Sequence, residues 1–463
     1  MQEACGVFGI YNFKEDSPAK SVYYGIFALQ HRGQESAGIA SSNGSEIRCF
    51  KGMGLVNQVF NEESLSGLTG NISIGHVRYS TCGSSIIENA QPIVIDTRYG
   101  SLALAHNGNL INSLYLRQKL KDRGISFVGT SDSEVMAAMI ATSEKINLED
   151  AIVDTLQQCK GAFSVLIMTK DKLIAVRDPN GIRPLTIGKL ENAYVVASET
   201  CALDIVGAQH IRDVINGEIV VIEKEGLRSK TWQMGEREAI CVFEYIYFAR
   251  PDSILHGRNV FEARSQMGKY LAKQNPTDAD MVMPVPESGV PAAIGYAEES
   301  KIPFGEGLIK NRYVGRTFIQ PSQEIRDLGV KLKLNPIRDA VRGKKVVVID
   351  DSIVRGTTSR QMISLIREAG AREVHMRVSS PPNICPCFYG IDTATKAELI
   401  ASNLSIEGIR KYLGADSLGY LSLDNLIRAV AIPKSNLCLA CFNNEYPVKV
   451  PEQMESLKLL FKS

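Results

Sequence analysis

The segment at residues 346–370 is the feature that most constrains how this chain can fold. Four apolar residues at 346–349 predict a buried strand of a parallel sheet. Two carboxylates, Asp350 and Asp351, follow where that strand ends. Apolar residues within 359–369 then recur at helix spacing, and a glycine, a common helix stop, comes next. A strand, a polar loop and a helix in this order predict an α/β unit.

The loop between this strand and this helix has the composition of a phosphate site. A helix N-terminus offers unpaired N–H groups and a positive dipole end, and Gly356 lets the backbone approach a ligand closely. The loop lacks the Gly-Lys-Ser/Thr of a Walker A sequence. Asp350 and Asp351 are placed to accept from ribose hydroxyls or to hold Mg²⁺ through water. An acidic turn that merely closes a strand is the alternative.

Length and composition bound the remaining possibilities. The 463 residues allow two or three domains, each with a full core. The net charge of +1 gives no argument for nucleic acid or an anionic membrane as partner. The sequence has neither an apolar run of membrane-spanning length nor the basic and apolar parts of a signal peptide. Ten cysteines in such a chain indicate reduced thiols, so we expect a cytoplasmic protein.

Two regions differ in pattern. Residues 5–230 contain many short apolar runs broken by Gly and Asn, with helical patterns near 18–30 and 132–143. This predicts layered sheets with helices outside, an α+β domain. A polar stretch follows, so we place a domain boundary after residue 230 and expect an α/β domain over 231–463.

Cys5 is the candidate nucleophile of the first region. A lone cysteine beside a strand is most often a small buried hydrophobe. The position of Cys5 changes this interpretation, because removal of residues 1–4 as a propeptide would give it both a thiol and a free α-amine. An α-amine titrates at about pH 8 and can act as base for the adjacent thiol.

Polar turns after apolar runs supply further candidates for acyl-transfer chemistry. Asn107 and Gly108 could offer a side-chain amide and a backbone N–H to an oxyanion. Arg78 could bind a carboxylate, and Asp132 could bind an ammonium group. Each also has a structural explanation, since Asn-Gly is commonly a turn and Ser-Asp commonly a helix cap.

Five motifs in this order resemble the class II glutamine amidotransferases, which are N-terminal-nucleophile glutaminases with an αββα fold. They are Cys5-Gly-Val-Phe-Gly9, Gln30-His-Arg-Gly-Gln34, Gly75-His-Val-Arg-Tyr79, His106-Asn-Gly-Asn109 and Ser131-Asp-Ser-Glu134. The resemblance implies that Cys5 attacks the glutamine amide and that Asn107 and Gly108 form the oxyanion hole. It also implies that Arg78 and Asp132 bind the glutamine α-carboxylate and α-amine. Arg32 matches an arginine that supports the closed site.

The segment that begins at residue 346 resembles the phosphoribosyl pyrophosphate (PRPP) signature of type I phosphoribosyltransferases. The resemblance implies that Asp350 and Asp351 face the ribose and Mg²⁺. The implied 5′-phosphate turn comprises Ser352, Arg355, Gly356, Thr357 and Thr358. A second loop, with Glu287, Ser288 and Gly289, matches the family's pyrophosphate loop, with Ser288 near the metal. The basic segment 310–333, which includes Lys310 and Tyr313, resembles the mobile loop that closes over PRPP.

Five cysteines of the second region remain. Cys438 and Cys441 form a CxxC, the spacing that lets two thiolates reach one metal centre. A zinc site and a pair of buried thiols that bind nothing are both alternatives. A thioredoxin-type redox pair is disfavoured because we expect no strand and helix around the CxxC. The sequence resembles members of its family that carry a [4Fe–4S] cluster, which implies Cys241, Cys387, Cys438 and Cys441 as ligands. Cys385 is an alternative to Cys387 as the remaining cluster ligand, and we favour Cys387.

Glutaminase motifs and a PRPP signature in one chain resemble the amidophosphoribosyltransferase family. The resemblance implies that glutamine is hydrolysed at Cys5 and that ammonia passes internally to displace pyrophosphate at C1 of PRPP. The product, 5-phosphoribosylamine, begins purine synthesis. The resemblance also implies Mg²⁺, a homotetramer and allosteric feedback inhibition by purine nucleotides. Tyr245 and Tyr313 are weaker candidates for lining the ammonia passage.

Two alternatives come from other classes. One is a PRPP-sensing binding protein with a vestigial glutaminase domain, which should carry a DNA-binding module and a basic face. The near-zero net charge argues against it. The other is a glutaminase joined to a different synthase, and the Asp350–Thr358 motif argues against that.

Overall fold

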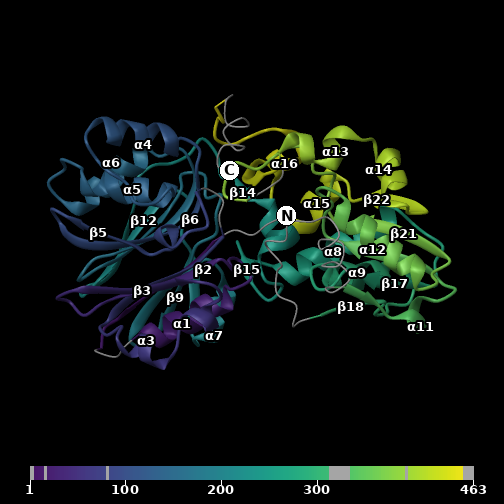
Figure 1. The fold of residues 1–463 in the computed structure, drawn as a ribbon, viewed down its shortest axis with the longest axis horizontal. Helices are drawn as coiled ribbons and strands as arrows, with labels where there is room; N and C mark the ends of the chain where they lie inside the picture. The colour runs from purple at the N-terminus through teal and green to yellow at the C-terminus, as the bar shows by residue number, and fades with distance from the viewer. Residues whose placement is uncertain (1–4, 15–17, 80–82, 312–333, 392–394, 452–463) are drawn as a thin grey trace.

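The computed structural model describes residues 5–14, 18–79, 83–311, 334–391 and 395–451. The chain forms two lobes that lie side by side, one made by the first half of the sequence and one by the second (Figure 1). Among the described residues, no helix combines the length and the apolar character that crossing a membrane requires.

The first lobe is built from two stacked antiparallel sheets. The seven-stranded sheet has the order β11-β9-β10-β1-β4-β2-β3, and the six-stranded sheet has the order β13-β12-β8-β7-β6-β5. The strands of the first sheet are β1 (Gly6–Asn12), β2 (Ser36–Ser42), β3 (Ile47–Met53), β4 (Ile72–Arg78), β9 (Thr186–Leu190), β10 (Ala193–Ala197) and β11 (Gln209–Asp213). Those of the second are β5 (Ile93–Thr97), β6 (Gly100–Leu110), β7 (Gly161–Met168), β8 (Leu173–Arg177), β12 (Glu218–Glu223) and β13 (Gly226–Thr231).

Helices cover the outer faces of both sheets (Figure 1). The helices on the side of the first sheet are α1 (Ala19–Ala28), α2 (Val56–Val59), α3 (Glu62–Ser66) and α7 (Thr200–Ile205), and those on the side of the second are α4 (Ser113–Asp122), α5 (Asp132–Ala141) and α6 (Leu148–Gln158). Alternation along the strands explains the layers, because successive side chains point to opposite faces. In β1, Val7 and Tyr11 pack between the sheets, whereas Phe8 and Ile10 pack towards α1. The predicted αββα arrangement is confirmed.

The second lobe contains a four-stranded parallel sheet in the order β17-β20-β21-β22. Its strands are β17 (Met281–Pro284), β20 (Lys345–Asp350), β21 (Glu373–Val378) and β22 (Ser417–Tyr420), and its main helices are α8 (Val260–Gln274), α9 (Val290–Ser300), α12 (Thr357–Glu368), α14 (Ile406–Leu413) and α15 (Leu423–Val430). Val347 and Ile349 pack on the face with α8, α9 and α15, and Val346 and Val348 on the face with α12 and α14. Burial on both faces is the reason for the unbroken apolar run, and the predicted α/β unit is confirmed.

Shorter elements complete this lobe. They are β14 (Ile240–Cys241), η2 (Glu244–Phe248), β15 (Ile254–Leu255), β16 (Arg258–Asn259), β18 (Leu308–Lys310), β19 (Leu334–Pro336), α11 (Arg338–Val341), η3 (Lys396–Glu398), α13 (Ile400–Asn403), η4 (Lys434–Asn436), β23 (Leu437–Cys438) and α16 (Ala440–Asn443). The helix expected from residue 359 begins two residues earlier, because Gly356 takes a left-handed conformation (φ 77°) and caps α12.

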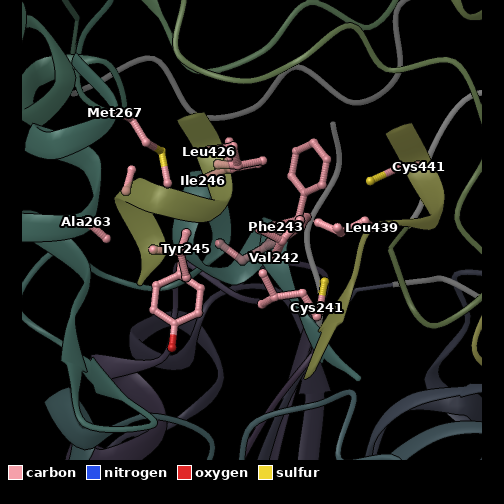
Figure 2. Close-up of a cluster of buried hydrophobic side chains, with 14 of the residues drawn as sticks. Cys241, Val242, Phe243, Tyr245, Ile246, Ala263, Met267, Leu426, Leu439 and Cys441 are labelled. Carbon is pink, nitrogen blue, oxygen red and sulfur yellow. The ribbon is translucent and has the colours of Figure 1, made fainter. Parts of the chain in front are cut away.

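One hydrophobic core crosses from the second lobe into the first. Phe243, Tyr245 and their neighbours pack with residues of α8 and α15, as Figure 2 shows. The same core includes Ile111 and Ile182 from the first lobe. The sheets of the first lobe end with β13 at Thr231 and the next strand begins at Ile240, while the boundary after residue 230 stays a prediction.

Candidate active sites

Cys5 lies directly before β1, near the centre of the seven-stranded sheet, and its side chain is buried. Its Sγ donates to the carbonyl oxygen of Tyr79 at 3.4 Å. Burial raises the pKa of the Cys5 thiol, and the hydrogen bond to Tyr79 and the charge of Arg78 oppose this only in part. The thiol is therefore neutral at pH 7 and needs a base before it can act as a nucleophile. The predicted propeptide, residues 1–4, lies outside the described residues.

Arg78 and Asp132 lie near this thiol. Arg78 ends β4, the strand next to β1, and its buried guanidinium donates to the carboxylate of Glu35. Asp132 is the first residue of α5, and its Oδ2 accepts from the backbone N–H of Leu110 at 2.9 Å. Arg78, Asp132 and Glu35 all act electrostatically on the Cys5 thiol. The structure thus brings the predicted glutamine-binding pair to the predicted nucleophile and adds Glu35, which sequence reasoning missed.

Asn107 and Gly108 lie on β6. A Cβ on Gly108, whose φ is +155°, would stand 2.0 Å from the carbonyl oxygen of Ala162, so only glycine fits there. The Asn107 side chain is buried, and its Nδ2 is 3.5 Å from Ser198 Oγ. Its Oδ1 has no hydrogen-bond partner among the residues that the structure describes. A poorly satisfied buried amide costs about 1–3 kcal/mol, and such groups are typical of sites that complete their hydrogen bonds with a ligand.

Arg32 is buried beside the nucleophile. Its Nε donates to the carbonyl oxygen of Cys5 at 2.9 Å. Its Nη1 donates to Glu199 at 2.6 Å, and its Nη1 and Nη2 donate to the two carboxylate oxygens of Glu244 at 2.9 and 2.8 Å. Burial opposes the charge on Glu244, but Arg32 and then Arg183 lower its pKa below the ordinary range. The arginine predicted to support the site therefore links it to η2 of the second lobe.

The two carboxylates of the second lobe lie at the carboxyl-terminal edge of the parallel sheet. Asp350 ends β20, and the backbone N–H of Asp351 donates to its Oδ1 at 3.0 Å. Desolvation and the adjacent charge of Asp351 raise the pKa of Asp350 well above its usual range. Ser352 Oγ donates to Asp351 Oδ1 at 2.5 Å. Two crowded carboxylates at this edge suit a cation or hydroxyl donors.

The loop after these carboxylates runs into α12. A Cβ on Gly356 would stand 2.8 Å from Ile400 Cδ1, and the positive φ independently favours glycine. Thr357 and Thr358 open the helix with exposed side chains, and the first turn holds no acidic residue. Arg355 Nε and Nη2 donate to Glu398 Oε1 at 3.1 and 2.9 Å on the surface. The twelve-residue helix thus points a positive dipole end at the loop.

The predicted pyrophosphate loop lies beside these carboxylates. Glu287 and Ser288 lie between β17 and α9, and Gly289 caps α9. A Cβ on Gly289 would stand 2.5 Å from the carbonyl oxygen of Ile349, so the loop rests against the end of β20. Lys310 ends β18, and its Nζ lies 4.0 Å from Glu287 Oε2. Tyr313 falls within 312–333, outside the described residues.

The cysteines of the second lobe converge from three short segments. Cys241 on β14 and Cys438 on β23 are partners in a parallel pair, and Cys441 lies on α16. Figure 2 shows Cys241 and Cys441 at one edge of the hydrophobic cluster. Burial raises the pKa of Cys241 to about 12. Cys387 is among the causes of the raised pKa values of Cys241, Cys438 and Cys441, so all four thiols are neighbours.

The four cysteine thiols form the candidate metal site of the second lobe. No group of three or more His, Cys, Asp or Glu side chains among the described residues has the geometry to hold a metal ion. A four-iron cluster binds each thiolate to a different iron, so its ligands stand farther apart than those of one ion. Four thiols, three of them buried and that of Cys387 half-buried, fit that chemistry in number and type. Cys385 Sγ instead donates to Asn444 Oδ1 at 3.3 Å.

The surroundings of the CxxC correct one expectation. Cys438 ends a two-residue strand and Cys441 lies in a four-residue helix, whereas no strand and helix were expected there. The strand exists because Leu437 and Cys438 pair with Ile240 and Cys241, a contact without local signal in the sequence. Burial raises the pKa of both CxxC thiols, which opposes thiolate formation and still disfavours a redox pair.

Several functional side chains were not found from the sequence. Glu35 directly follows the Gln30–Gln34 motif, whereas Glu199 lies outside all five motifs. Arg183 lies outside these motifs as well, and it donates to Glu244 at 2.9 Å. Glu244 itself had no signal, because its partners Arg32 and Arg183 are remote in the chain.

Comparison with known proteins finds a domain of the expected kind in each half of the chain. A family model described as a glutamine amidotransferase domain matches residues 76–204. A phosphoribosyl transferase domain matches residues 252–382. The chain is 52% identical over 468 residues to the amidophosphoribosyltransferase of Synechocystis sp., covering 100% of this chain and 94% of that relative. It is 51% identical over 455 residues to the enzyme of the same name from Bacillus subtilis, covering 97% of this chain and 95% of that relative.

Two solved structures share the fold over almost the full length. One, described as the allosteric regulatory enzyme of purine biosynthesis, has a TM-score of 0.93 at 49% identity and covers 98% of this chain and 99% of its own. The other is the glutamine PRPP amidotransferase of B. subtilis complexed with ADP and GMP, with a TM-score of 0.91 at 50% identity, covering 97% of this chain and 98% of its own. From motifs, fold and relatives together, this chain belongs to the amidophosphoribosyltransferase family.

Proposed function

We propose that this chain makes 5-phosphoribosylamine from PRPP and glutamine, as the committing step of purine synthesis, with one site in each lobe. The observation that carries the proposal is the buried bridge from Arg32 to Glu244. It joins the backbone of a candidate nucleophile in one lobe to the lobe that holds the Asp350–Asp351 edge. A PRPP-sensing protein with a vestigial glutaminase domain would not need buried charges that hold the backbone of Cys5 against the second lobe.

In the first site, Cys5 Sγ attacks the carbon of the glutamine side-chain amide. Once residues 1–4 are removed, the α-amine of Cys5 takes the thiol proton and returns it to the leaving nitrogen. The C–N bond breaks, ammonia leaves, and water hydrolyses the thioester to glutamate. Asn107 Nδ2 and the N–H of Gly108 stabilise the oxyanion. Arg78 and Asp132 bind the α-carboxylate and α-amine of the substrate.

In the second site, the nitrogen of ammonia bonds to C1 of PRPP as the bond from C1 to pyrophosphate breaks. Asp350 and Asp351 bind the ribose hydroxyls, and the 352–358 loop binds the 5′-phosphate at the start of α12. Glu287, Ser288, Gly289 and Lys310 surround the pyrophosphate, with Tyr313 from the closing loop. Bound Mg²⁺, held by Ser288, Asp350 and Asp351, supplies charge neutralisation.

The remaining features of the enzyme follow the same family relationship. We propose that Cys241, Cys387, Cys438 and Cys441 hold a structural [4Fe–4S] cluster. Purine nucleotides act as allosteric feedback inhibitors of a cytoplasmic homotetramer, consistent with the B. subtilis structure that contains ADP and GMP. Tyr245 remains a candidate for the ammonia passage. Its hydroxyl points away from the apolar cluster in Figure 2 and donates to the carbonyl oxygen of Leu255 at 2.7 Å.

Separate assays of the two sites test the proposal. Cys5→Ala should abolish synthesis from glutamine, with a loss of about 10⁴-fold or more, while synthesis from ammonium salts continues. Asp351→Asn should abolish synthesis from either nitrogen source while glutamine hydrolysis continues. Retention of glutamine-dependent synthesis by Cys5→Ala would refute the nucleophile assignment. Intact mass, iron and sulfide on the anaerobically purified protein test the propeptide and the cluster.

A further inference from the structure

We propose that the second-lobe segment Phe388–Gly390 positions the oxyanion strand of the glutaminase site. This inference rests on the proposed function of Asn107 and Gly108. The first contact is a hydrogen bond from Asn109 Nδ2 to the carbonyl oxygen of Phe388 at 2.8 Å, between residues 279 positions apart. It joins the residue directly after the oxyanion pair to the other lobe.

The second contact is close packing of two glycines. A Cβ on Gly390 would stand 2.8 Å from the carbonyl carbon of Gly108 and 3.0 Å from its Cα and its oxygen. Gly390 therefore rests directly on the backbone of Gly108. A Cβ on Gly108 would in turn stand 2.0 Å from the oxygen of Ala162 on β7. The oxyanion residue is thus in close contact with both β7 and the 388–390 segment.

The third contact ties the segment to the buried charges. The carbonyl oxygen of Tyr389 accepts from Arg183 Nε at 2.9 Å, and Arg183 Nη1 donates to Glu244 at 2.9 Å. Glu244 in turn accepts from Arg32, which holds the carbonyl of Cys5. Three consecutive residues of the second lobe therefore meet the first lobe, and the same network reaches both the nucleophile and the oxyanion hole.

The segment is anchored on its own side as well. The Tyr389 hydroxyl donates to the carbonyl oxygen of Val448 at 2.5 Å and accepts from the Val448 N–H at 3.1 Å. Along β6, the neighbouring strand β5 pairs with residues 100–104, so within the described part of the chain Asn107–Asn109 have a paired strand on the β7 side alone. A firmly held segment at this place can fix the position of the oxyanion donors.

The expected consequence is a defect in turnover rather than in substrate binding. Loss of one oxyanion donor lowers kcat by about 10²–10³-fold, and a misplacement of about 1 Å can cost about 10²-fold. In the proposed function glutamine is held by Arg78 on β4 and Asp132 on α5, whereas the segment packs on β6. The proposed PRPP site lies at the carboxyl-terminal edge of the parallel sheet, on other residues than these three. The 388–390 segment is therefore a positioning element for glutamine hydrolysis.

Gly390→Ala in the full-length protein is the direct test. Its Cβ must displace Gly108, so we expect kcat for glutamine hydrolysis to fall about 10–100-fold with KM changed by less than about threefold. Synthesis from ammonium and the rate at which iodoacetamide alkylates Cys5 should stay within about twofold, because neither needs the oxyanion hole. Gly414→Ala is the matched control, with a similar positive φ of 74° but open space around its Cβ. The control should leave every rate unchanged.

Asn109→Ala provides a second route if Gly390→Ala does not fold. It removes the hydrogen bond to Phe388 without adding an atom, and we expect a smaller fall in kcat, about 3–10-fold, again at constant KM. An unchanged kcat, a rise in KM alone, or parallel loss of the ammonium-dependent activity would each overturn the inference. Failure of the proposed function itself would look different, since Cys5→Ala would then still hydrolyse glutamine.

Discussion

Arg32 and Glu244, 212 positions apart in the chain, form a fully buried two-point ion pair with N···O distances of 2.9 and 2.8 Å. Because Arg32 also donates to the carbonyl oxygen of Cys5, a carboxylate of the second lobe fixes the backbone of the proposed nucleophile. Arg183 donates to the same carboxylate, so two arginines of the first lobe share one partner in the second. The pair therefore couples the stability of the lobe contact to the geometry of the glutaminase site.

Glu244→Gln keeps the shape of the side chain and removes its charge. Two buried guanidinium groups then lose a charged partner, and breaking a buried pair costs about 3–5 kcal/mol. We expect a loss of that order in the free energy of unfolding, measured by urea denaturation at neutral pH. Glu46→Gln is the control, because its ion pair with Arg48 is half exposed and should contribute less than about 0.5 kcal/mol. Equal effects of the two substitutions would contradict the prediction.

His76 predicts a pH dependence of stability. Burial lowers the pKa of His76 from 6.5 to about 3. In the unfolded chain this group binds a proton below about pH 6.5, whereas in the folded chain it stays neutral. Its contribution to the free energy of unfolding is therefore complete above pH 6.5. That contribution is lost as the pH falls towards 3, by about 1.4 kcal/mol per pH unit.

Urea denaturation at several pH values between 7 and 5 measures this slope. Between pH 7 and pH 5, the free energy of unfolding of His76→Gln should fall by about 2 kcal/mol less than that of the unsubstituted protein. Burial also lowers the pKa values of His106 and His256, so part of the slope should remain in the variant. Identical slopes would show that His76 is already protonated in the folded protein.

Gly356→Ala should impair the proposed PRPP site without impairing the glutaminase site. The new Cβ would stand 2.8 Å from Ile400 Cδ1 at a φ of 77°, and such strain costs about 1–3 kcal/mol. We expect KM for PRPP to rise at least about tenfold as the loop shifts, while kcat for glutamine hydrolysis is retained. Gly343→Ala, with a φ of 73° and open space, controls for backbone strain. Loss of glutamine hydrolysis in Gly356→Ala would contradict this separation.

The choice between Cys385 and Cys387 can be decided by metal content. Cys387 acts electrostatically on Cys241, Cys438 and Cys441, whereas Cys385 donates to Asn444. Cys387→Ser should therefore lose iron and sulfide during anaerobic purification, and Cys385→Ser should retain both. The measurement is iron and sulfide per chain, with visible absorbance on the same samples. The reverse pattern would assign the ligand to Cys385.

Removal of iron offers a related measurement on the unsubstituted protein. Phe388 follows Cys387 directly, and its carbonyl oxygen accepts from Asn109. If Cys387 anchors this segment through the cluster, chelation of the iron should raise hydrogen exchange at residues 388–390 and then lower kcat for glutamine hydrolysis. Ammonium-dependent synthesis should fall later or not at all. Unchanged exchange at 388–390 would show that the segment is held by its protein contacts alone.

The sequence by itself determined the local features of this protein. The apolar run at 346–349, the carboxylates after it and the glycine before the next helix predicted β20, the loop and α12 almost to the residue. Short apolar runs broken by Gly and Asn in the first half predicted layered sheets with helices outside them. These features were predictable because a strand that is buried on two faces, or on one, imposes its pattern on consecutive residues.

Only the tertiary structure decided which distant residues complete the glutaminase site. Glu244, Arg183 and Phe388–Gly390 have no periodic or local signal, because each acts through a partner far away in the chain. The parallel strand pairing that sets Cys241 opposite Cys438 was hidden for the same reason, although the resemblance implied both as ligands of one cluster. Sequence pattern records the neighbours that a residue has along the chain, whereas the charges and backbone contacts that hold Cys5 and Gly108 arise when the two lobes meet.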